Sequence, residues 1–215
     1  NRLRDELQQS TQIILIEADL TEKNALAEKI GSILNFPLDV VVSCPGILGE
    51  MEPVRFMHVE RDVLNVMNVN FLGIEKAIHT LIPHLSDSSS VVLITSTNGR
   101  QPLECGTAYC SSKSALEQFG TSLALELAPK TRVNTVAPGY VQTKMHTPYF
   151  ESKGEENEFF SELKAKKPLR RITTPQNVAD AVVFLSSDLA RGLTGISIPV
   201  DCGESLMMGK SDEQC

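Results

Sequence analysis

The stretch VVLITSTNGRQPLECGTAYCSSK (residues 91–113) decides the fold, because it passes from a strand-like run through a loop into a helix-like one. VVLITS (91–96) is short and mostly apolar, which indicates a buried strand. Ser96 closes this run, and Tyr109 and Lys113 follow on the predicted helix. Residues four apart on a helix share a face, and open α/β sheets bind ligands at the carboxyl ends of their strands. The stretch therefore predicts a hydroxyl, a phenol and an ammonium at one site.

These three groups can exchange protons with a carbonyl compound if the pKa of the phenol is lowered toward neutral pH. Free tyrosine has a pKa of about 10, and bringing it near 7 requires roughly 4 kcal/mol. An ammonium about 4.5 Å away contributes about 3.7 kcal/mol at an effective dielectric constant of about 20. We therefore expect Lys113 to lower the pKa of Tyr109. A second pair with the same spacing, Tyr140 and Lys144, lies in a predicted loop without a matching serine and is typical of an exposed, solubilising surface.

Composition limits the classes of protein that the chain can represent. Its 215 residues, 41% of them apolar, suit a single domain with a sizeable core. A net charge of −7 opposes a nucleic-acid partner, and no apolar run is long enough to predict a membrane span. Five cysteines without CxxC spacing indicate a reducing, intracellular and thus cytoplasmic location. The four histidines are scattered, so no metal site is expected.

Periodicity predicts alternating strands and helices. Apolar runs indicate strands over 12–18, 38–44, 91–96, 132–138 and 195–201. Helical patterns cover 2–9, 21–34, 60–82, 107–128 and 175–188, with Thr21 and Thr174 as expected N-caps. This order predicts an α/β fold with a doubly wound parallel sheet in a single domain over residues 1–215. The charged stretch 140–173, helical around 155–166, is either a lid over a ligand or a plain surface loop.

Six segments in order resemble the short-chain dehydrogenase/reductase family, in its compact form. They are Asp19 after IILIEA, VVSCPGI (41–47), VNFLG (69–73), ITSTNG with AYCSSK (94–99 and 108–113), NTVAPGYVQT (134–143), and residues 168–203. The resemblance implies a Rossmann-type fold, NAD or NADP as cofactor, a small carbonyl or alcohol as substrate, and a homodimer or homotetramer. It leaves the choice between NAD and NADP open.

The resemblance also implies roles for individual residues. Tyr109 would donate or accept the proton, Ser96 would hold the substrate oxygen, and Lys113 would tune Tyr109 and bind the nicotinamide ribose. Asn70 would support a water-mediated proton relay through Lys113. The implied cofactor-binding residues are Asp19, Gly46, Tyr109, Lys113, Pro138, Gly139 and Thr143. Two of these assignments have simpler alternatives. Asp19 could be no more than a helix-capping carboxylate, and Asn70 could be an ordinary helix residue without a role in the site.

Two departures from the family pattern carry expectations of their own. SCPG (43–46) replaces Asn-Asn-Ala-Gly, so Pro45 removes a backbone donor near the cofactor. No Gly-rich, phosphate-binding turn precedes Gly31, so we expect an N-terminally incomplete sheet that lacks roughly 30–40 residues and binds dinucleotide poorly. The leading hypothesis is an NAD(P)-dependent oxidoreductase. The alternative is a non-catalytic, truncated interaction or regulatory protein on the same scaffold.

Overall fold

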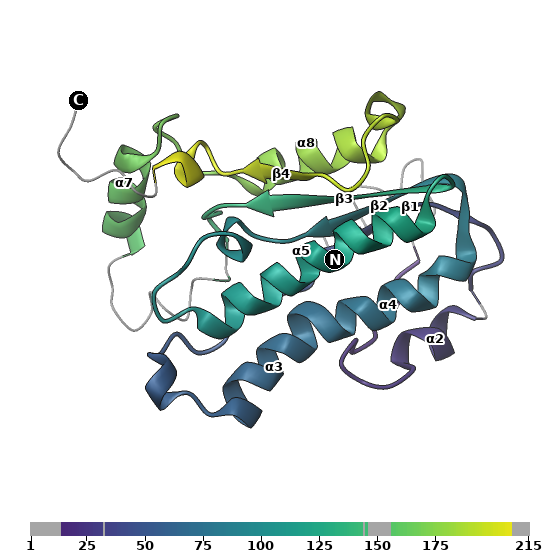
Figure 1. Cartoon of the computed structure of the whole chain (residues 1–215), viewed down its shortest axis with the longest axis horizontal. Helices are drawn as coiled ribbons and strands as arrows, with labels where there is room; N and C mark the ends of the chain where they lie inside the picture. Colours follow the sequence, from purple (N-terminus) through teal and green to yellow (C-terminus); the bar gives the residue numbers. More distant parts are fainter. Residues whose placement is uncertain (1–13, 32, 144, 146–155, 208–215) are drawn as a thin grey trace.

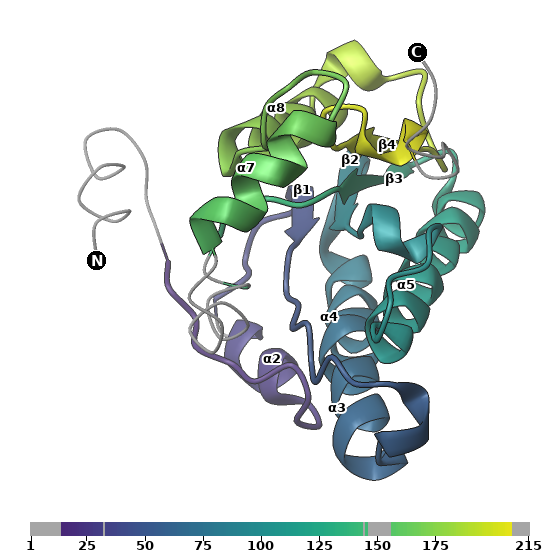
Figure 2. The same cartoon turned by 90° about the vertical axis from the view of Figure 1, so that its left-hand side faces the viewer.

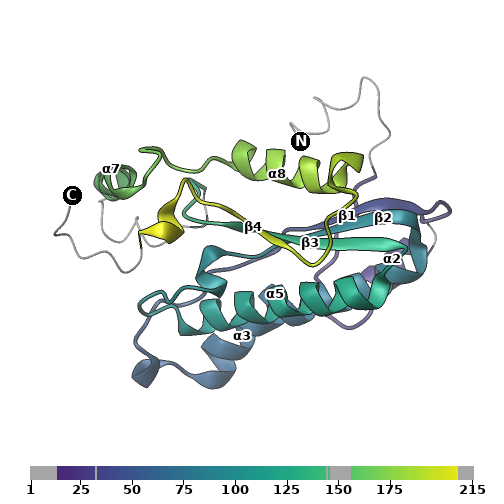
Figure 3. The same ribbon diagram turned by 45° about the horizontal axis from the view of Figure 1, so that its top comes forward.

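The structure, a computed structural model, describes residues 14–31, 33–143, 145 and 156–207. Within them, four parallel strands form one sheet in the order β1-β2-β3-β4. The strands are β1 (Leu38–Ser43), β2 (Leu85–Ile94), β3 (Thr131–Pro138) and β4 (Ser197–Val200). Helices cover both faces of this sheet (Figures 1 and 3). The predicted α/β class with a parallel sheet is confirmed.

The two faces are covered by different helices. On one face lie α5 (Thr107–Leu127) and a continuous helical stretch made of Val59–Val63, α3 (Leu64–Met67), Asn68–Leu72 and α4 (Gly73–Leu81). On the other face lies α8 (Pro175–Ser186), with α7 (Glu156–Lys166) at the end of the molecule (Figures 1 and 3). These elements confirm the predicted helices over 60–82, 107–128 and 175–188 within a few residues. No helix in the described part of the chain has the length and apolar character to cross a membrane.

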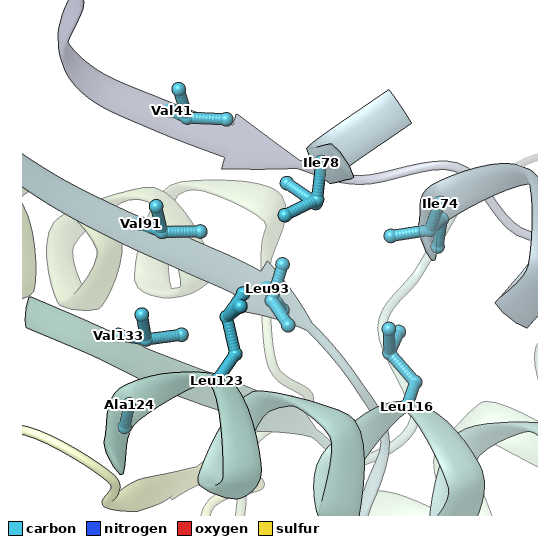
Figure 4. Packing of buried hydrophobic residues seen from close by; sticks show 9 residues of the cluster. All are labelled: Val41, Ile74, Ile78, Val91, Leu93, Leu116, Leu123, Ala124 and Val133. Carbon is cyan, nitrogen blue, oxygen red and sulfur yellow. The ribbon is translucent and has the colours of Figure 1, made fainter. Parts of the chain in front are cut away.

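Successive residues of β2 build two separate cores. Val91 and Leu93 point toward α4 and α5, where they pack with Ile74 and Leu116 (Figure 4). Val92 points to the opposite face and packs with Leu185 of α8. Because a buried parallel strand needs apolar residues on both faces, the run in β2 is nearly continuous rather than alternating. The core therefore holds the carboxyl ends of neighbouring strands together at one end of the sheet.

The N-terminal part differs from the sequence-based expectation. The predicted strand over 12–18 is wrong for its described part, because residues 14–18 have no regular secondary structure and Leu15 is 67% exposed. A strand needs a partner, and β1 pairs only with β2 among the described residues. The predicted helix over 2–9 lies outside the described residues.

The first described helix is shorter than its pattern. The sequence predicts a helix over 21–34, whereas α2 covers Ala25–Ile30 and Asn24 occupies the N-cap position. Thr21 is not the cap, because its backbone N–H and its hydroxyl both donate to the Asp19 carboxylate. Short polar side chains compete in this way with helix formation.

β1 leaves apolar groups uncovered at the edge of the sheet. Val40 and Val42 are 43% and 46% exposed, although Val41 between them is buried in the core. Figure 2 shows β1 at the outer side of the sheet, next to β2, at the end of the strand order. Within the described ranges, β1 therefore has a strand neighbour on one side only.

The N-terminus of α8 gives a direct test of the local structure. Thr174 and Asn177 form a capping box, in which each side chain accepts from the other residue's backbone N–H. Thr174→Ala should lower the free energy of unfolding by about 1 kcal/mol, measured by urea denaturation. Thr121→Ala, on an exposed turn of α5, is the control and should change it by less than about 0.5 kcal/mol. Equal effects of the two substitutions would contradict the role of the cap.

Candidate active site

A cavity of about 810 Å³ opens at the carboxyl edge of the sheet. Its walls come from the loops after β1, β2 and β3 and from parts of α5, α7 and α8. Seven of the sequence-predicted site residues line it, namely Gly46, Ser96, Tyr109, Lys113, Pro138, Gly139 and Thr143. The strand-to-helix stretch 91–113 therefore brings its three polar groups to one place, as its spacing predicts.

Ser96 follows β2 in an extended conformation and begins a short 3-10 turn at Thr97–Gly99. Its Oγ accepts a hydrogen bond from the backbone N–H of Asn98 at 3.2 Å. With this bond filling an acceptor position, the hydroxyl hydrogen can be donated. It reaches the Tyr109 phenol, since a hydrogen bond from Ser96 favours the ionised form of that side chain.

Tyr109 lies in the first turn of α5 and is 8% exposed. Burial raises the pKa of its phenol above the ordinary value of 10.0, and the hydrogen bond from Ser96 offsets only part of this rise. The expectation that Lys113 lowers this pKa is therefore wrong for the chain without ligands. The physical reason is that removing the phenol from water penalises the phenolate more than its neighbours stabilise it.

Lys113 lies one turn further along α5 and is 3% exposed. Its Nζ donates to the carbonyl oxygen of Ile94, the last residue of β2, at 3.2 Å and lies 6.0 Å from the centroid of the Tyr109 ring. Burial lowers the pKa of this ammonium to about 8, although the nearby Cys44 works in the opposite direction. Lys113 is thus held at the cavity wall, and its ammonium group loses its proton more readily than that of a free lysine.

Asn70 is fully buried behind the cavity, in a π-helical turn (Asn68–Leu72). Its Oδ1 accepts from the backbone N–H of Ile47 at 2.8 Å, and its Nδ2 donates to the carbonyl oxygen of Ile47 at 2.9 Å. Nδ2 also donates to Ser112 Oγ at 3.0 Å, which in turn donates to the carbonyl oxygen of Tyr109 at 2.7 Å. The Asn70 amide therefore ties the loop after β1 to α5.

Ser112 and the apolar walls of the cavity were not predicted from the sequence. Ser112 lies within AYCSSK, but only the folded chain shows that it bridges Asn70 and Tyr109. Tyr140 and Phe159 also line the cavity, with their ring centroids 5.5 Å apart. The sequence indicated packing for Phe159 and an exposed surface for Tyr140, whereas the structure places both at the cavity wall.

Two glycines are required by close approach of other groups. A Cβ on Gly46 would lie 3.3 Å from Lys113 Nζ, so the glycine leaves that ammonium accessible from the cavity. A Cβ on Gly139 would lie 2.5 Å from Glu204 Oε2 and 2.7 Å from Asp201 Cβ. Substitution at either position would displace a charged side chain.

Asp19 and Thr143 differ in their position relative to the cavity. Asp19 is exposed and is not among the cavity residues, and its hydrogen bonds from Thr21 lower its pKa. Asp19 caps no described helix either, because α2 begins at Ala25 with Asn24 as its N-cap. Thr143 lines the cavity, and its Oγ1 accepts from the Met145 backbone N–H at 3.4 Å.

The residues present fit the nicotinamide half of a dinucleotide. The open face of Gly46, the buried cationic side chain of Lys113 and the polar hydroxyls of Ser96 and Tyr109 share one wall. A buried cation beside a glycine without a Cβ suits the hydroxyl groups of a ribose. Among the described residues, no glycine-rich turn at a helix N-terminus adds a pyrophosphate cradle to this wall.

The chain matches known proteins over most of its length. Residues 1–205 match the profile of the protein family described as enoyl-(acyl carrier protein) reductase. The chain is 34% identical over 167 residues to tropinone reductase-like 3 of Erythroxylum coca, covering 77% of this chain and 62% of that protein. It is 31% identical over 199 residues to cyclohexanol dehydrogenase of Rhodococcus sp. (strain TK6), covering 87% and 71% of the two chains. The matched region thus spans about three fifths of the first of these relatives.

Solved structures agree with this assignment. Aldohexose dehydrogenase of Thermoplasma acidophilum superposes with a TM-score of 0.87 at 28% identity, covering 96% of this chain and 84% of that one. A short chain dehydrogenase family protein of Francisella tularensis subsp. tularensis SCHU S4 gives a TM-score of 0.83 at 31% identity, covering 93% and 86%. With this sheet and these matches, the chain has a Rossmann-type fold and belongs to the short-chain dehydrogenase/reductase family.

Proposed function

We propose that this protein is an NAD(P)-dependent oxidoreductase that interconverts a carbonyl compound and an alcohol, with Tyr109 as general acid and base. The observation that carries the proposal is the shared cavity wall of Ser96, Tyr109 and Lys113. The family supports an oxidoreductase, and the site supplies the proton chemistry that carbonyl reduction needs. A bound nicotinamide ring would supply or accept the hydride.

Tyr109 and Ser96 handle the substrate oxygen. The Ser96 hydroxyl donates a hydrogen bond to that oxygen, and Tyr109 passes its proton to it as the alcohol forms. Because burial raises the pKa of Tyr109, the phenol keeps its proton at neutral pH. The acid needed for reduction is therefore present before substrate binds, and oxidation of an alcohol requires more alkaline conditions.

Lys113 and Asn70 serve cofactor binding and proton supply rather than the substrate oxygen. Lys113 Nζ lies beside Gly46 at the cavity wall and would bind the ribose hydroxyls of the dinucleotide. Pro138, Gly139 and Thr143 line the same cavity and would hold the nicotinamide end. Asp19 remains the proposed partner of the adenine ring. Asn70 fixes the loop at Ile47, and it would support a water-mediated proton relay through Lys113.

The substrate side of the cavity favours a compact, largely apolar compound. Leu48, Leu103 and Phe159 line this part of the wall, and apolar walls with few polar groups are typical of such sites. A cyclohexanol dehydrogenase among the relatives acts on an alcohol of this kind. The described part of the 140–173 stretch, with Phe159 on α7, would serve as a lid over this substrate.

The assembly and the location of the protein follow from weaker signals. Leu64 and Leu72 on the helical stretch and Leu125 on α5 are exposed, the last by 83%, which favours a homodimer or homotetramer. Cys44, Cys105, Cys110 and Cys202 are unpaired within the described residues, which favours a reducing, cytoplasmic location.

Tyr109→Phe tests the proposed function directly. With cyclohexanone and NADPH or NADH, the wild-type chain should turn over substrate, and the variant should lose about 10²-fold or more of kcat because the general acid is gone. Quenching or enhancement of nicotinamide fluorescence should show that the variant still binds dinucleotide. Turnover retained within threefold in the variant would contradict the role of the phenol. Absence of dinucleotide binding by the full-length protein would instead support the non-catalytic alternative.

Lys113→Met should separate stability from activity. Below pH 8 the lysine is charged in both the folded and the unfolded chain, so folding pays the full cost of burying that charge. A lowering from 10.5 to about 8 corresponds to about 3 kcal/mol. Between these pH values the folded chain releases the proton first, so wild-type stability rises with pH.

Urea denaturation at several pH values checks this expectation. Lys113→Met should be more stable than wild type at pH 7 by up to about 3 kcal/mol, with the difference shrinking toward pH 10.5. The same variant should have lost most of its turnover. A variant that is less stable than wild type across the whole range would show that the buried ammonium stabilises the fold.

A further inference from the structure

Lys167 is buried where no step of the proposed chemistry uses it. It lies just beyond the end of α7 and is 1% exposed, as deeply covered as the apolar core. Its Nζ forms an ion pair with Glu204 Oε2 at 2.7 Å and donates to the carbonyl oxygen of Tyr140 at 3.4 Å. A buried ammonium is costly unless it is paired, so this arrangement calls for an explanation.

The ion pair holds both backbone groups of a single residue. Glu204 Oε2 accepts from the Tyr140 backbone N–H at 3.2 Å, while Lys167 Nζ donates to the Tyr140 carbonyl oxygen. Tyr140 is the second residue after β3, which ends at Pro138. Between them, Gly139 passes so close to Glu204 that a Cβ there would lie 2.5 Å from Oε2. The two charges therefore fix the chain at the point where it leaves the sheet.

The turn that carries Glu204 is held by Asp201 within the turn and by Gln101 from a distant loop. The Asp201 carboxylate accepts from the backbone N–H groups of Gly203 and Ser205, both at 2.8 Å, so it positions the turn on either side of Glu204. Gln101 Nε2, from the loop between Ser96 and Tyr109, donates to the Ser205 carbonyl oxygen at 2.9 Å. The loops after β2, β3 and β4 are thus joined through this network.

The network ends at the cavity wall. Tyr140 lines the cavity beside Val141, and its ring packs against Phe159 of α7 with centroids 5.5 Å apart. Lys167 follows the same helix, so it links the position of α7 to the backbone of Tyr140. A shift of the Tyr140 backbone would move this wall relative to Ser96 and Tyr109 on the other side.

We propose that Lys167 and Glu204 are positioning residues, whose ion pair clamps the Tyr140 backbone and thereby sets the wall of the cavity that faces the substrate. This inference rests on the proposed function for its effect on catalysis, whereas the clamp itself can be measured without turnover. Neither residue contacts the reacting atoms, so both act through Tyr140 and α7.

The test uses two double variants that avoid leaving one buried charge unpaired. Lys167→Met with Glu204→Met removes both charges and both contacts to Tyr140. Lys167→Met with Glu204→Gln also removes both charges but keeps an acceptor for the Tyr140 N–H. Lys130→Met, which breaks the exposed Lys130–Asp87 ion pair, is the matched control.

Hydrogen exchange of backbone amides, followed by mass spectrometry, measures how firmly the Lys167–Glu204 pair holds the Tyr140 backbone. In the Met/Met variant, a peptide over 138–143 should exchange at least tenfold faster than in wild type, while a peptide over 131–136 in β3 should not change. The Met/Gln variant should recover part of the protection. Lys130→Met should leave both peptides unchanged.

Kinetics report the effect on the site. With cyclohexanone, the Met/Met variant should raise KM by roughly tenfold and change kcat by less than about threefold, because the reacting groups stay in place. Wild-type exchange and wild-type KM in the Met/Met variant would overturn the proposal. Faster exchange in both peptides would also overturn it, because the pair would then only stabilise the fold. If the wild-type chain shows no turnover, the proposed function fails while the exchange data still decide on the clamp.

Discussion

The buried side-chain amide of Asn70 is the contact on which the geometry of the site depends. All of its polar atoms are bonded, to both backbone groups of Ile47 and to Ser112 on α5. A buried amide that lost one of these partners would carry the cost of an unpaired polar group. The loop after β1 and the helix that carries Tyr109 and Lys113 are therefore held in one relative position. The π-helical turn at Asn68–Leu72 is the local irregularity that contains this side chain, in keeping with the frequent use of such turns at functional sites.

Burial decides the state of the ionisable groups that this contact brings together. Tyr109 is held as a neutral phenol and Lys113 as an ammonium that is a stronger acid than a free lysine, each because the protein interior disfavours its charged form. The site thus stores free energy that the fold must supply from its two apolar cores. This is the usual relation between a functional site and the scaffold around it, in which stability is given up where chemistry requires it.

The sequence predicted the scaffold and the meeting of the main groups, because both depend on local patterns. The apolar run at 91–96 and the spacing of Ser96, Tyr109 and Lys113 were enough to place three side chains at one edge of a parallel sheet. The N-cap at Thr174 was equally readable, since the backbone N–H that it accepts from lies only three residues further along the chain.

Features that depend on distant segments could not be predicted in this way. The direction of the Tyr109 pKa shift depends on how deeply the phenol is buried, and spacing along one helix does not contain that information. The apolar run over 12–18 resembles a strand, but its described part has no partner strand to pair with. Lys167 and Glu204 belong to charged segments that read as solvent-exposed, and only the folded chain brings them together inside.

The most direct test of the account is the protonation of Tyr109 in the folded chain. The near-ultraviolet absorbance of phenolate, measured against pH as the difference between wild type and Tyr109→Phe, isolates this side chain from the other tyrosines. The account predicts that the midpoint of the difference signal lies above pH 10, since burial raises the pKa beyond its ordinary value of 10.0. A difference signal already present at neutral pH would contradict it, because Tyr109 would then be a phenolate and could not act as the resident acid.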